Sequence, residues 1–486
     1  MCFGLIIAVI NNNCKRMSVF FEKKYVPFVF LFLIVFLSRL PFLSAGYGVE
    51  EDSWGIALAA FHTKCTGIYE PSRLPGHPFQ EYIYSFLWGS GPIVFNALSA
   101  FFSAMGAVFF ALSLKELKFR QSFLAALALA FVPVYYISST YTIDFAWTLA
   151  LILIALYCLL KNKYILCGVF LGLAVGCRIT SGVLLIPFMV IIWQSDLKLN
   201  FVRLLKMSIP MVIISIALFI PVYLQFGFSF FMYYDQFPYP SFAKVIYKMI
   251  PGVWGFIGTI SLLLFFIIAM VRKKNQQVGE AFNHLLSKKI IIASFILIVL
   301  YCISYFRLPQ KSGYMIPVIP FVILLFGYFL NGRNFSLLCW SLCSSSFFCS
   351  INLTDAYRGS DYSPYAQIFH VSGQELFFDP VTGPVFSDYS KRKQKMAFTD
   401  LVIRKSAEGS KKKVIIAGWW YNELMVTTLG DTGNRSTVYE FYIDESRLSY
   451  YKEKQYDIFY LPEQNKYNDL MHNMDITDKY AKAFMD

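Results

Sequence analysis

The chain has 486 residues, of which 57% are hydrophobic, 19% are aromatic and only 15% are charged. A soluble domain carries about 25% charged residues, so this composition excludes an ordinary soluble enzyme. The aromatic content also excludes a disordered chain, because it supplies a large apolar surface. Residues 352–486 hold 19 of the 30 acidic and 17 of the 43 basic residues, so residues 1–351 have 11 acidic residues against 26 basic ones. We therefore expect a polytopic membrane domain over 1–351 and a water-soluble domain over 352–486.

The segment Met1–Ile10 is apolar but short, and no basic residue precedes it, so it does not read as a signal peptide; a start at Met17 would remove it. Apolar runs that cross a bilayer need about 17–25 residues. We predict about eleven transmembrane helices, near 26–44, 92–114, 121–138, 143–160, 164–177, 180–194, 207–224, 251–271, 290–306, 314–330 and 335–351. The short fifth and sixth runs are also compatible with a helical hairpin or a broken helix.

The basic residues of the loops predict the orientation of these helices. One set of alternate loops contains eighteen Lys and Arg residues, including those at 15–24, 115–120, 161–163, 198–206, 272–289 and Arg333, whereas the other set contains seven. The basic set is expected in the cytoplasm, and the positive net charge is therefore a topology signal rather than a sign of nucleic-acid binding. We predict a cytoplasmic N-terminus and an extracytoplasmic C-terminal domain.

Seven of the eleven acidic residues of the membrane part fall in the predicted outer loops: Glu50, Glu51, Asp52, Glu70, Glu81, Asp144 and Asp235. The run Glu50-Glu51-Asp52 follows directly after the first span. Neighbouring carboxylates repel one another and raise at least one pKa, which suits a general base near neutral pH. A hydrated loop or a helix N-terminus would explain the same run without any chemistry.

The predicted outer side also collects cations at or near membrane depth. Arg39 lies late in the first span, Arg178 lies between two apolar runs, and Arg307 and Lys311 lie in the last outer loop. Buried ionisable groups of this kind usually line a polar cavity, although Arg39 and Lys311 could also reach the lipid headgroups. Cations together with carboxylates would suit a phosphorylated lipid substrate, because the cations bind the phosphate and a carboxylate activates the attacking group.

The first outer loop, 45–91, is long for such a protein, and long loops are more often functional than idle. It contains Arg73 and His77-Pro78, and then an apolar and aromatic stretch over 82–88 that reads as an amphipathic helix at the membrane interface. The tail reads as a mixed α/β domain, with buried strands at 413–418 and 456–461 and a basic amphipathic helix around 388–407. Trp419 and Trp420, directly after the first of these strands, could contact a sugar or simply pack in the core.

These features together resemble the C-type (GT-C) glycosyltransferases, integral membrane enzymes that take a sugar from a polyprenyl-phosphate carrier. The closest resemblance is to the protein O-mannosyltransferase and lipid A aminoarabinose transferase branch. Arg39, the acidic run after the first span, His77-Pro78, Asp144 and the turn ending in Arg178 occur in the family's order. Lys311 and Tyr314 fit its late Lys-x-x-Tyr-x-x-Pro-x-x-Pro pattern. Two departures are Asn96, where relatives often have Arg, and the run Glu-Glu-Asp in place of Asp-Glu or Asp-Asp.

The resemblance implies a mainly α GT-C fold and a single displacement at the sugar's anomeric carbon on the outer face. Asp52, or else Glu51, would be the base, and Arg178, Arg307 and Lys311 would hold the departing phosphate, with help from Arg73 or Arg39. The remaining candidates for substrate binding are Glu50, His77, Asp144 and Tyr314. No metal is required, although the three carboxylates could hold Mg²⁺ or Mn²⁺.

The expected partners are a polyprenyl-phosphate sugar donor, a lipid, glycan or protein acceptor, and membrane lipids, and the expected location is a bacterial inner membrane. Two rival functions remain open. A lipid-linked sugar flippase or transporter would more often show internal repeats, and we find none. A glycan polymerase or ligase usually carries its main outer loop late in the membrane domain, whereas here the longest loop is the first.

Overall fold

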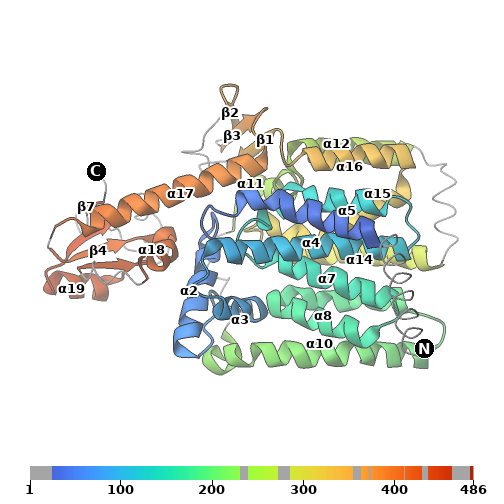
Figure 1. Cartoon of the computed structure of the whole chain (residues 1–486), viewed down its shortest axis with the longest axis horizontal. Coiled ribbons are helices and arrows are strands. Elements are labelled where there is room, and N and C mark those ends of the chain that lie inside the picture. Colours follow the sequence, from blue (N-terminus) through green and yellow to red (C-terminus); the bar gives the residue numbers. More distant parts are fainter. Residues whose placement is uncertain are drawn as a thin grey trace, which may run out of the picture.

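The structure is a computed structural model, and it describes residues 25–229, 239–271, 285–353, 363–371, 374–409, 411–429, 436–461 and 482–484. Figure 1 shows long, roughly parallel helices, with α2 running across one end of the bundle and the short helix α3 beside it. The C-terminal elements lie beyond that same end. The segment Met1–Ile10, Met17, Asp235 and the basic residues at 15–24 and 272–274 lie outside the described residues.

The bundle begins with a helix over 25–39. The elements that follow are η1 (Leu40–Phe42), α2 (Glu51–Thr66), α3 (Pro78–Phe86), α4 (Pro92–Glu116), α5 (Ser122–Phe131), α6 (Pro133–Ser138), α7 (Phe145–Leu160), α8 (Tyr164–Cys177), η2 (Ile179–Leu184), α9 (Leu185–Ile192), α10 (Leu197–Phe226), α11 (Phe242–Met249), α12 (Pro251–Val271), α14 (Leu285–Arg307), η5 (Ser312–Val318), α15 (Ile319–Phe329) and α16 (Gly332–Ser344).

Six of the described helical segments are long and apolar enough to cross a membrane. They are Tyr25–Phe42, Pro92–Glu116, Leu197–Phe226, Pro251–Val271, Lys288–Arg307 and Ser312–Phe329. Four shorter apolar segments cover 122–131, 145–160, 164–177 and 179–192. The helices fall where the apolar runs predicted them, but the count of eleven spans is not established.

Several of the predicted spans differ from simple helices, among them 121–138, 180–194 and 335–351. The run 121–138 is divided into α5 and α6 because Val132 is extended before Pro133, which disfavours helical backbone at the preceding residue. The run 180–194 begins as the 3-10 helix η2. The run 335–351 is helical only to Ser344, and strand β1 (Ser350–Leu353) follows.

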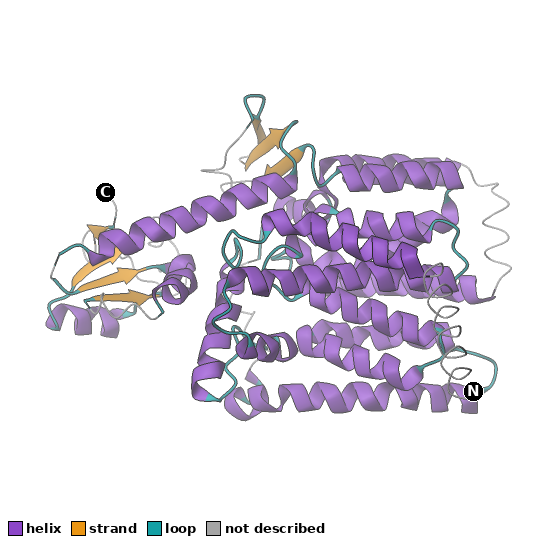
Figure 2. Cartoon of the chain, viewed as in Figure 1, coloured by secondary structure: helices purple, strands orange, loops and turns teal. Residues whose placement is uncertain are grey.

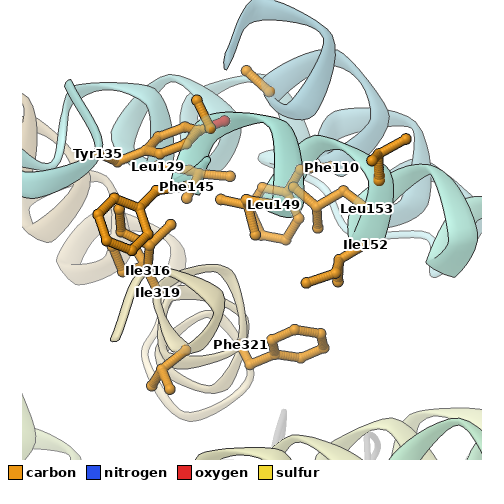
Figure 3. Close-up of a cluster of buried hydrophobic side chains, with 14 of the residues drawn as sticks. Phe110, Leu129, Tyr135, Phe145, Leu149, Ile152, Leu153, Ile316, Ile319 and Phe321 are labelled. Carbon is orange, nitrogen blue, oxygen red and sulfur yellow. The ribbon is translucent and has the colours of Figure 1, made fainter. Parts of the chain in front are cut away.

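A stripe of glycines lets α8 and α10 pack closely. A Cβ atom on Gly168 would lie 2.1 Å from the carbonyl oxygen of Met207, and one on Gly172 would lie 2.9 Å from that of Met211. Small residues at spacings of four let membrane helices approach in this way. On the other side of α8, α7 is buried along nearly its whole length, and its side chains pack against α4, α5 and the η5–α15 segment (Figure 3).

The start of the first outer loop is held by a buried asparagine. Asn96 on α4 donates hydrogen bonds of 2.8 Å to the carbonyl oxygens of Leu43 and Gly46, and it accepts one of 2.9 Å from Thr142. Asn96, which stands where relatives often have Arg, therefore fixes the path of the chain just before Glu50. Most of this loop forms α2 and α3, and α3 covers much of the stretch expected to be an interfacial helix, with its Tyr84 completely buried.

The C-terminal part contains two small sheets (Figure 2). Its elements are β1 (Ser350–Leu353), β2 (Gln367–Val371), β3 (Gln374–Asp379), α17 (Pro384–Ala407), β4 (Lys413–Ile416), η7 (Gly418–Trp420), α18 (Tyr421–Thr428), β5 (Thr437–Glu440), α19 (Glu445–Glu453), β6 (Asp457–Tyr460) and β7 (Lys482–Ala483). The first sheet is antiparallel in the order β1-β3-β2, and the second is parallel in the order β5-β4-β6-β7. The two predicted strands and the predicted helix are confirmed as β4, β6 and α17.

Helix α17 anchors this part to the membrane bundle. The guanidinium of Arg392, which is 1% exposed, donates hydrogen bonds of 3.0 and 3.1 Å to the carbonyl oxygens of Phe42 and Thr140. It also forms an ion pair of 3.0 Å with Asp388. Lys395 donates a hydrogen bond of 2.9 Å to the carbonyl oxygen of Val49. The C-terminal part is thus attached directly to the segment that carries the acidic run.

Candidate active site

The acidic run forms the first turn of α2. Glu50 is the N-cap residue, and Glu51 and Asp52 are the first two residues of the helix. Carboxylates are favoured there because the helix dipole and the free backbone N–H groups are positive. The two interpretations of this run from the sequence are therefore compatible, since the carboxylates begin a helix and also contact cations.

Asp52 lies between two cations from distant segments. Its Oδ2 atom accepts hydrogen bonds from the guanidinium of Arg73 and from the ammonium of Lys311, and Lys311 also contacts Glu50. Burial by itself would raise the pKa of Asp52, but Arg73 and Lys311 outweigh it and hold that pKa well below its usual range. Burial would likewise lower the pKa of Lys311, but Asp52 and Glu50 raise it. Asp52 is thus a neutralised carboxylate.

A second carboxylate–cation group adjoins the first. The fully buried Asp144 accepts hydrogen bonds of 2.7 and 3.5 Å from Arg178. Arg73 links the two groups: its Nη2 atom lies 4.0 Å from Asp144, and its Nε atom lies 3.3 Å from Nε2 of His77. His77 is itself 3.8 Å from Asp144. We call Asp52, Arg73, His77, Asp144, Arg178 and Lys311 the charge cluster.

The side chain of Arg178 is held between aromatic rings and borders a cavity. Its guanidinium carbon lies 4.5 Å from the ring centre of Phe145 and 4.7 Å from that of Tyr314. The adjoining cavity has a volume of about 100 Å³ and is lined by polar and aromatic side chains that include Arg73, His77, Arg178, Tyr301, Ser304 and Tyr314. Two guanidinium groups therefore reach one small cavity whose remaining wall is partly apolar, as a lipid phosphate requires.

Glu51 faces the C-terminal part instead. The amide of Asn422, at the start of α18, donates a hydrogen bond of 3.1 Å to its Oε1 atom. Burial, with a further contribution from Asp52, raises the pKa of Glu51 to about 8, although Lys395, Lys311 and Arg73 partly oppose the shift. The expectation that neighbouring carboxylates raise at least one pKa therefore applies to Glu51, while Asp52 shifts in the opposite direction.

A buried glutamate shapes the loop that presents Arg73 and His77. Glu81, on α3, accepts hydrogen bonds from the backbone N–H groups of Ser72 and His77, at 3.1 and 2.9 Å, and from the hydroxyl of Tyr69. The sequence marked Glu81 only as an outer acid and gave it no role. Asn422 and Lys395 were not anticipated either, because nothing in the local pattern around them shows that the tail folds back onto α2.

The structure brings most of the predicted site residues together, but not all of them. Arg39 is fully buried elsewhere: it donates hydrogen bonds to Ser139 at 3.1 Å and to the carbonyl of Ala130, with its guanidinium 4.0 Å from the ring centre of Tyr136. It joins the end of the first span to α5 and α6. Arg307 is exposed at the end of α14 and forms no ion pair with a described residue.

Among the described residues, no group of three or more His, Cys, Asp and Glu side chains could hold a metal ion. Asp52 and Glu50 are directed at Lys311, and Asp52 also at Arg73. Two of the three carboxylates that the sequence suggested for Mg²⁺ or Mn²⁺ are therefore in contact with side-chain cations. The third, Glu51, accepts a hydrogen bond from Asn422.

The helical bundle, the pair of helices at one end and the appended α/β part together define an integral membrane protein of the GT-C fold. Crystal structures of ArnT from Cupriavidus metallidurans, a lipid A aminoarabinose transferase of this fold, are similar to the chain over nearly its whole length. The structure bound to undecaprenyl phosphate matches with a TM-score of 0.53 and 12% sequence identity, covering 92% of this chain and 94% of ArnT. The apo structure matches with a TM-score of 0.55 and 12% identity, covering 91% and 93%. No family model and no curated protein matches the sequence.

Proposed function

We propose that the chain is a glycosyltransferase that takes a sugar from a polyprenyl-phosphate donor and transfers it to an acceptor hydroxyl or amine on the outer face of a membrane. The observation that carries this proposal is the charge cluster, in which Arg73 and Arg178 line a cavity at one end of a membrane bundle and Lys311 shares the carboxylate of Asp52 with Arg73. The shared fold supports the donor class, because ArnT has been crystallised with undecaprenyl phosphate.

In this proposal the donor phosphate binds the cations that are paired with carboxylates in the structure without donor. A phosphate brought to Arg73 and Lys311 competes with Asp52 for the same N–H groups. Once these cations bind phosphate, the carboxylate of Asp52 loses the charges that depress its pKa and becomes a stronger base. The base is then activated only when the donor is present.

The reaction is one displacement. Asp52 accepts the proton of the acceptor hydroxyl or amine while the acceptor atom forms a bond to the anomeric carbon of the sugar. The bond from that carbon to the phosphate oxygen breaks, and its electron pair leaves with the polyprenyl phosphate. Arg73, Arg178 and Lys311 stabilise the departing phosphate, and Asp144 with the rings of Phe145 and Tyr314 keeps Arg178 in place.

Glu51 is the alternative base. With its pKa raised to about 8, it is mostly protonated at pH 7 and accepts a proton well only after it ionises. It is also directed at Asn422 rather than at the cations that would bind phosphate. We therefore assign the base role to Asp52 and a structural role to Glu51.

The contacts between loops support the alternating topology. Loops predicted on one side contact one another, as in the ion pair of 2.6 Å between Lys161 and Glu116 and the hydrogen bond of 3.0 Å from Gln121 to the carbonyl of Gly332. Loops predicted on the other side meet in the charge cluster. We propose that the first group is cytoplasmic and that the charge cluster and the C-terminal part are extracytoplasmic, in the inner membrane of a bacterium.

The test is turnover with the purified full chain and radiolabelled undecaprenyl-phosphate sugars. We expect release of undecaprenyl phosphate that requires an acceptor extract, and at least a 100-fold loss of rate in Asp52→Asn. Glu70→Gln, which changes an exposed carboxylate of the same loop, is the matched control. Full activity in Asp52→Asn would refute the base assignment. Movement of intact donor across vesicles with no release of phosphate would instead indicate a flippase.

A further inference from the structure

The carbonyl oxygens of residues 46–49, just before the acidic run, each accept a hydrogen bond of 2.8 or 2.9 Å. Three of the donors belong to the membrane part: Asn96 donates to Gly46, the backbone N–H of Thr142 to Tyr47, and the indole of Trp54 to Gly48. The fourth donor is the ammonium of Lys395 on α17, which reaches Val49. The hydrogen bond nearest to Glu50 therefore comes from the C-terminal part of the chain.

One face of α17 lies along the segment 42–49. Residues three or four positions apart share a face of a helix. The side chains of α17 that contact this segment have that spacing: Arg392 at Phe42, Tyr389 at Ser44, Met396 at Gly46 and Lys395 at Val49. Met396 packs closely there, since a Cβ atom added to Gly46 would lie 3.1 Å from its sulfur. The contact is thus continuous, and Lys395 stands at the end nearest to the acidic run.

The ammonium of Lys395 is also held on the side of the C-terminal part. It forms an ion pair of 3.0 Å with Glu423 of α18, a residue that is 1% exposed, and it lies 5.1 Å from the ring centre of Trp420. The neighbour of Glu423, Asn422, donates the hydrogen bond to Glu51 described above. Because Lys395 has an ionic partner in α18 and a backbone partner just before α2, it ties the position of one helix to that of the other.

The orientation of the first turn of α2 decides where the carboxylate of Asp52 lies. This turn is closed by a hydrogen bond of 3.1 Å from the N–H of Ser53 to the carbonyl oxygen of Glu50. The peptide group that Lys395 holds joins Val49 to Glu50, so a rotation of that group moves the N-cap residue and the turn with it. Glycosyl transfer needs the base within hydrogen-bond reach of the acceptor, and a misplacement of about 1 Å can cost about 100-fold in rate.

We propose that Lys395 is a positioning residue for the transfer reaction, and that its hydrogen bond to Val49 sets the orientation of the turn that carries Asp52. Lys395 acts through the backbone and not on the substrate. The C-terminal part is then required for catalysis, because it supplies the last contact that fixes the base. This role rests on the proposed glycosyl transfer, but the effect of Lys395 on α2 can be measured without turnover.

The first test is hydrogen–deuterium exchange at the amides of residues 53–56, with the full chain in nanodiscs and no donor. The variant combines Lys395→Met with Glu423→Gln, so that no buried carboxylate is left without its cation. These amides should exchange at least about tenfold faster, whereas Glu423→Gln alone keeps the donor to Val49 and should stay within about threefold of the unchanged chain. Lys405→Met, at an exposed lysine of the same helix, is the control. If the double variant exchanges as slowly as Lys405→Met, the assignment is wrong. Equally faster exchange throughout α18 would show that Lys395 only holds the C-terminal part together, and would also overturn it.

Turnover gives the second readout. The double variant should lose at least about tenfold in kcat, while its KM for the polyprenyl-phosphate donor should change by less than about twofold, because Lys395 acts through Val49 and not on the phosphate. Lys395→Arg keeps the charge and the donors, and it should retain at least about a third of kcat. An unchanged kcat in the double variant, or a raised KM alone, would contradict the positioning role. If the unchanged chain releases no polyprenyl phosphate, the proposed function is refuted, and the exchange experiment still decides whether Lys395 holds the first turn of α2.

Discussion

Glu51 carries the clearest pH-dependent prediction. Its pKa is raised from 4.5 to about 8 in the folded chain, mainly by burial. Between these two values the folded state binds more protons than the unfolded state, so stability must fall as the pH rises and must level off above pH 8. One pKa unit corresponds to about 1.4 kcal/mol, so the shift of Glu51 from 4.5 to about 8 costs the folded state up to roughly 5 kcal/mol at pH 9.

The substitution Glu51→Gln removes this ionisation while keeping an oxygen that can accept the hydrogen bond from Asn422. We expect the variant to match the unchanged chain only at about pH 4.5 and below, and to have an increasingly higher unfolding midpoint as the pH rises toward 8. Thermal unfolding followed by tryptophan fluorescence between about pH 4.5 and 9.5 measures the difference. Glu453→Gln, at an exposed carboxylate on α19, is the control and should leave the pH dependence unchanged. Parallel curves for Glu51→Gln and the unchanged chain would show that Glu51 ionises normally.

Three further predictions follow from the contacts. Arg178→Gln should weaken the binding of undecaprenyl phosphate at least tenfold, whereas Arg203→Gln should not; equal affinities in a lipid-binding assay would contradict the role of Arg178. Arg392→Met should destabilise the fold by about 3 kcal/mol, because it leaves Asp388 and two carbonyl oxygens unpaired. Arg447→Met, which removes an exposed ion pair, is the control and should cost less than about 1 kcal/mol. Thermal unfolding measures both variants. EDTA should leave donor turnover unchanged, since side-chain cations contact the carboxylates; loss of activity that Mg²⁺ or Mn²⁺ restores would contradict this.

Much of the fold could be predicted from the sequence because membrane helices appear as long runs of apolar residues. Apolar runs of sufficient length located the long helices, and strand-like runs located β4 and β6. The signal fails where the backbone leaves regular geometry, as at Val132-Pro133, or where an apolar run ends in a strand, as at Ser350. There the conformation depends on proline sterics and on pairing with β3, which hydropathy does not measure.

Part of the site could be predicted because a charged residue inside a membrane is costly and is kept only where a partner or a function requires it. Asp144 and Arg178 stood out because each lies beside an apolar run, and they pair with one another. Arg39 stood out for the same reason but binds Ser139 and the carbonyl of Ala130. A buried charged side chain can therefore have its partners within the protein, where it holds helices together, rather than in a substrate. Asn422 could not be found, because its contact with Glu51 joins residues 371 positions apart.

The most direct test of this account is the position of the phosphate in an experimental structure of the chain with undecaprenyl phosphate. The account predicts that the phosphate lies among Arg73, Arg178 and Lys311, and that Asp52 no longer contacts Lys311. A phosphate bound away from these cations, with the ion pairs of Asp52 intact, would contradict both the donor site and the activation of the base.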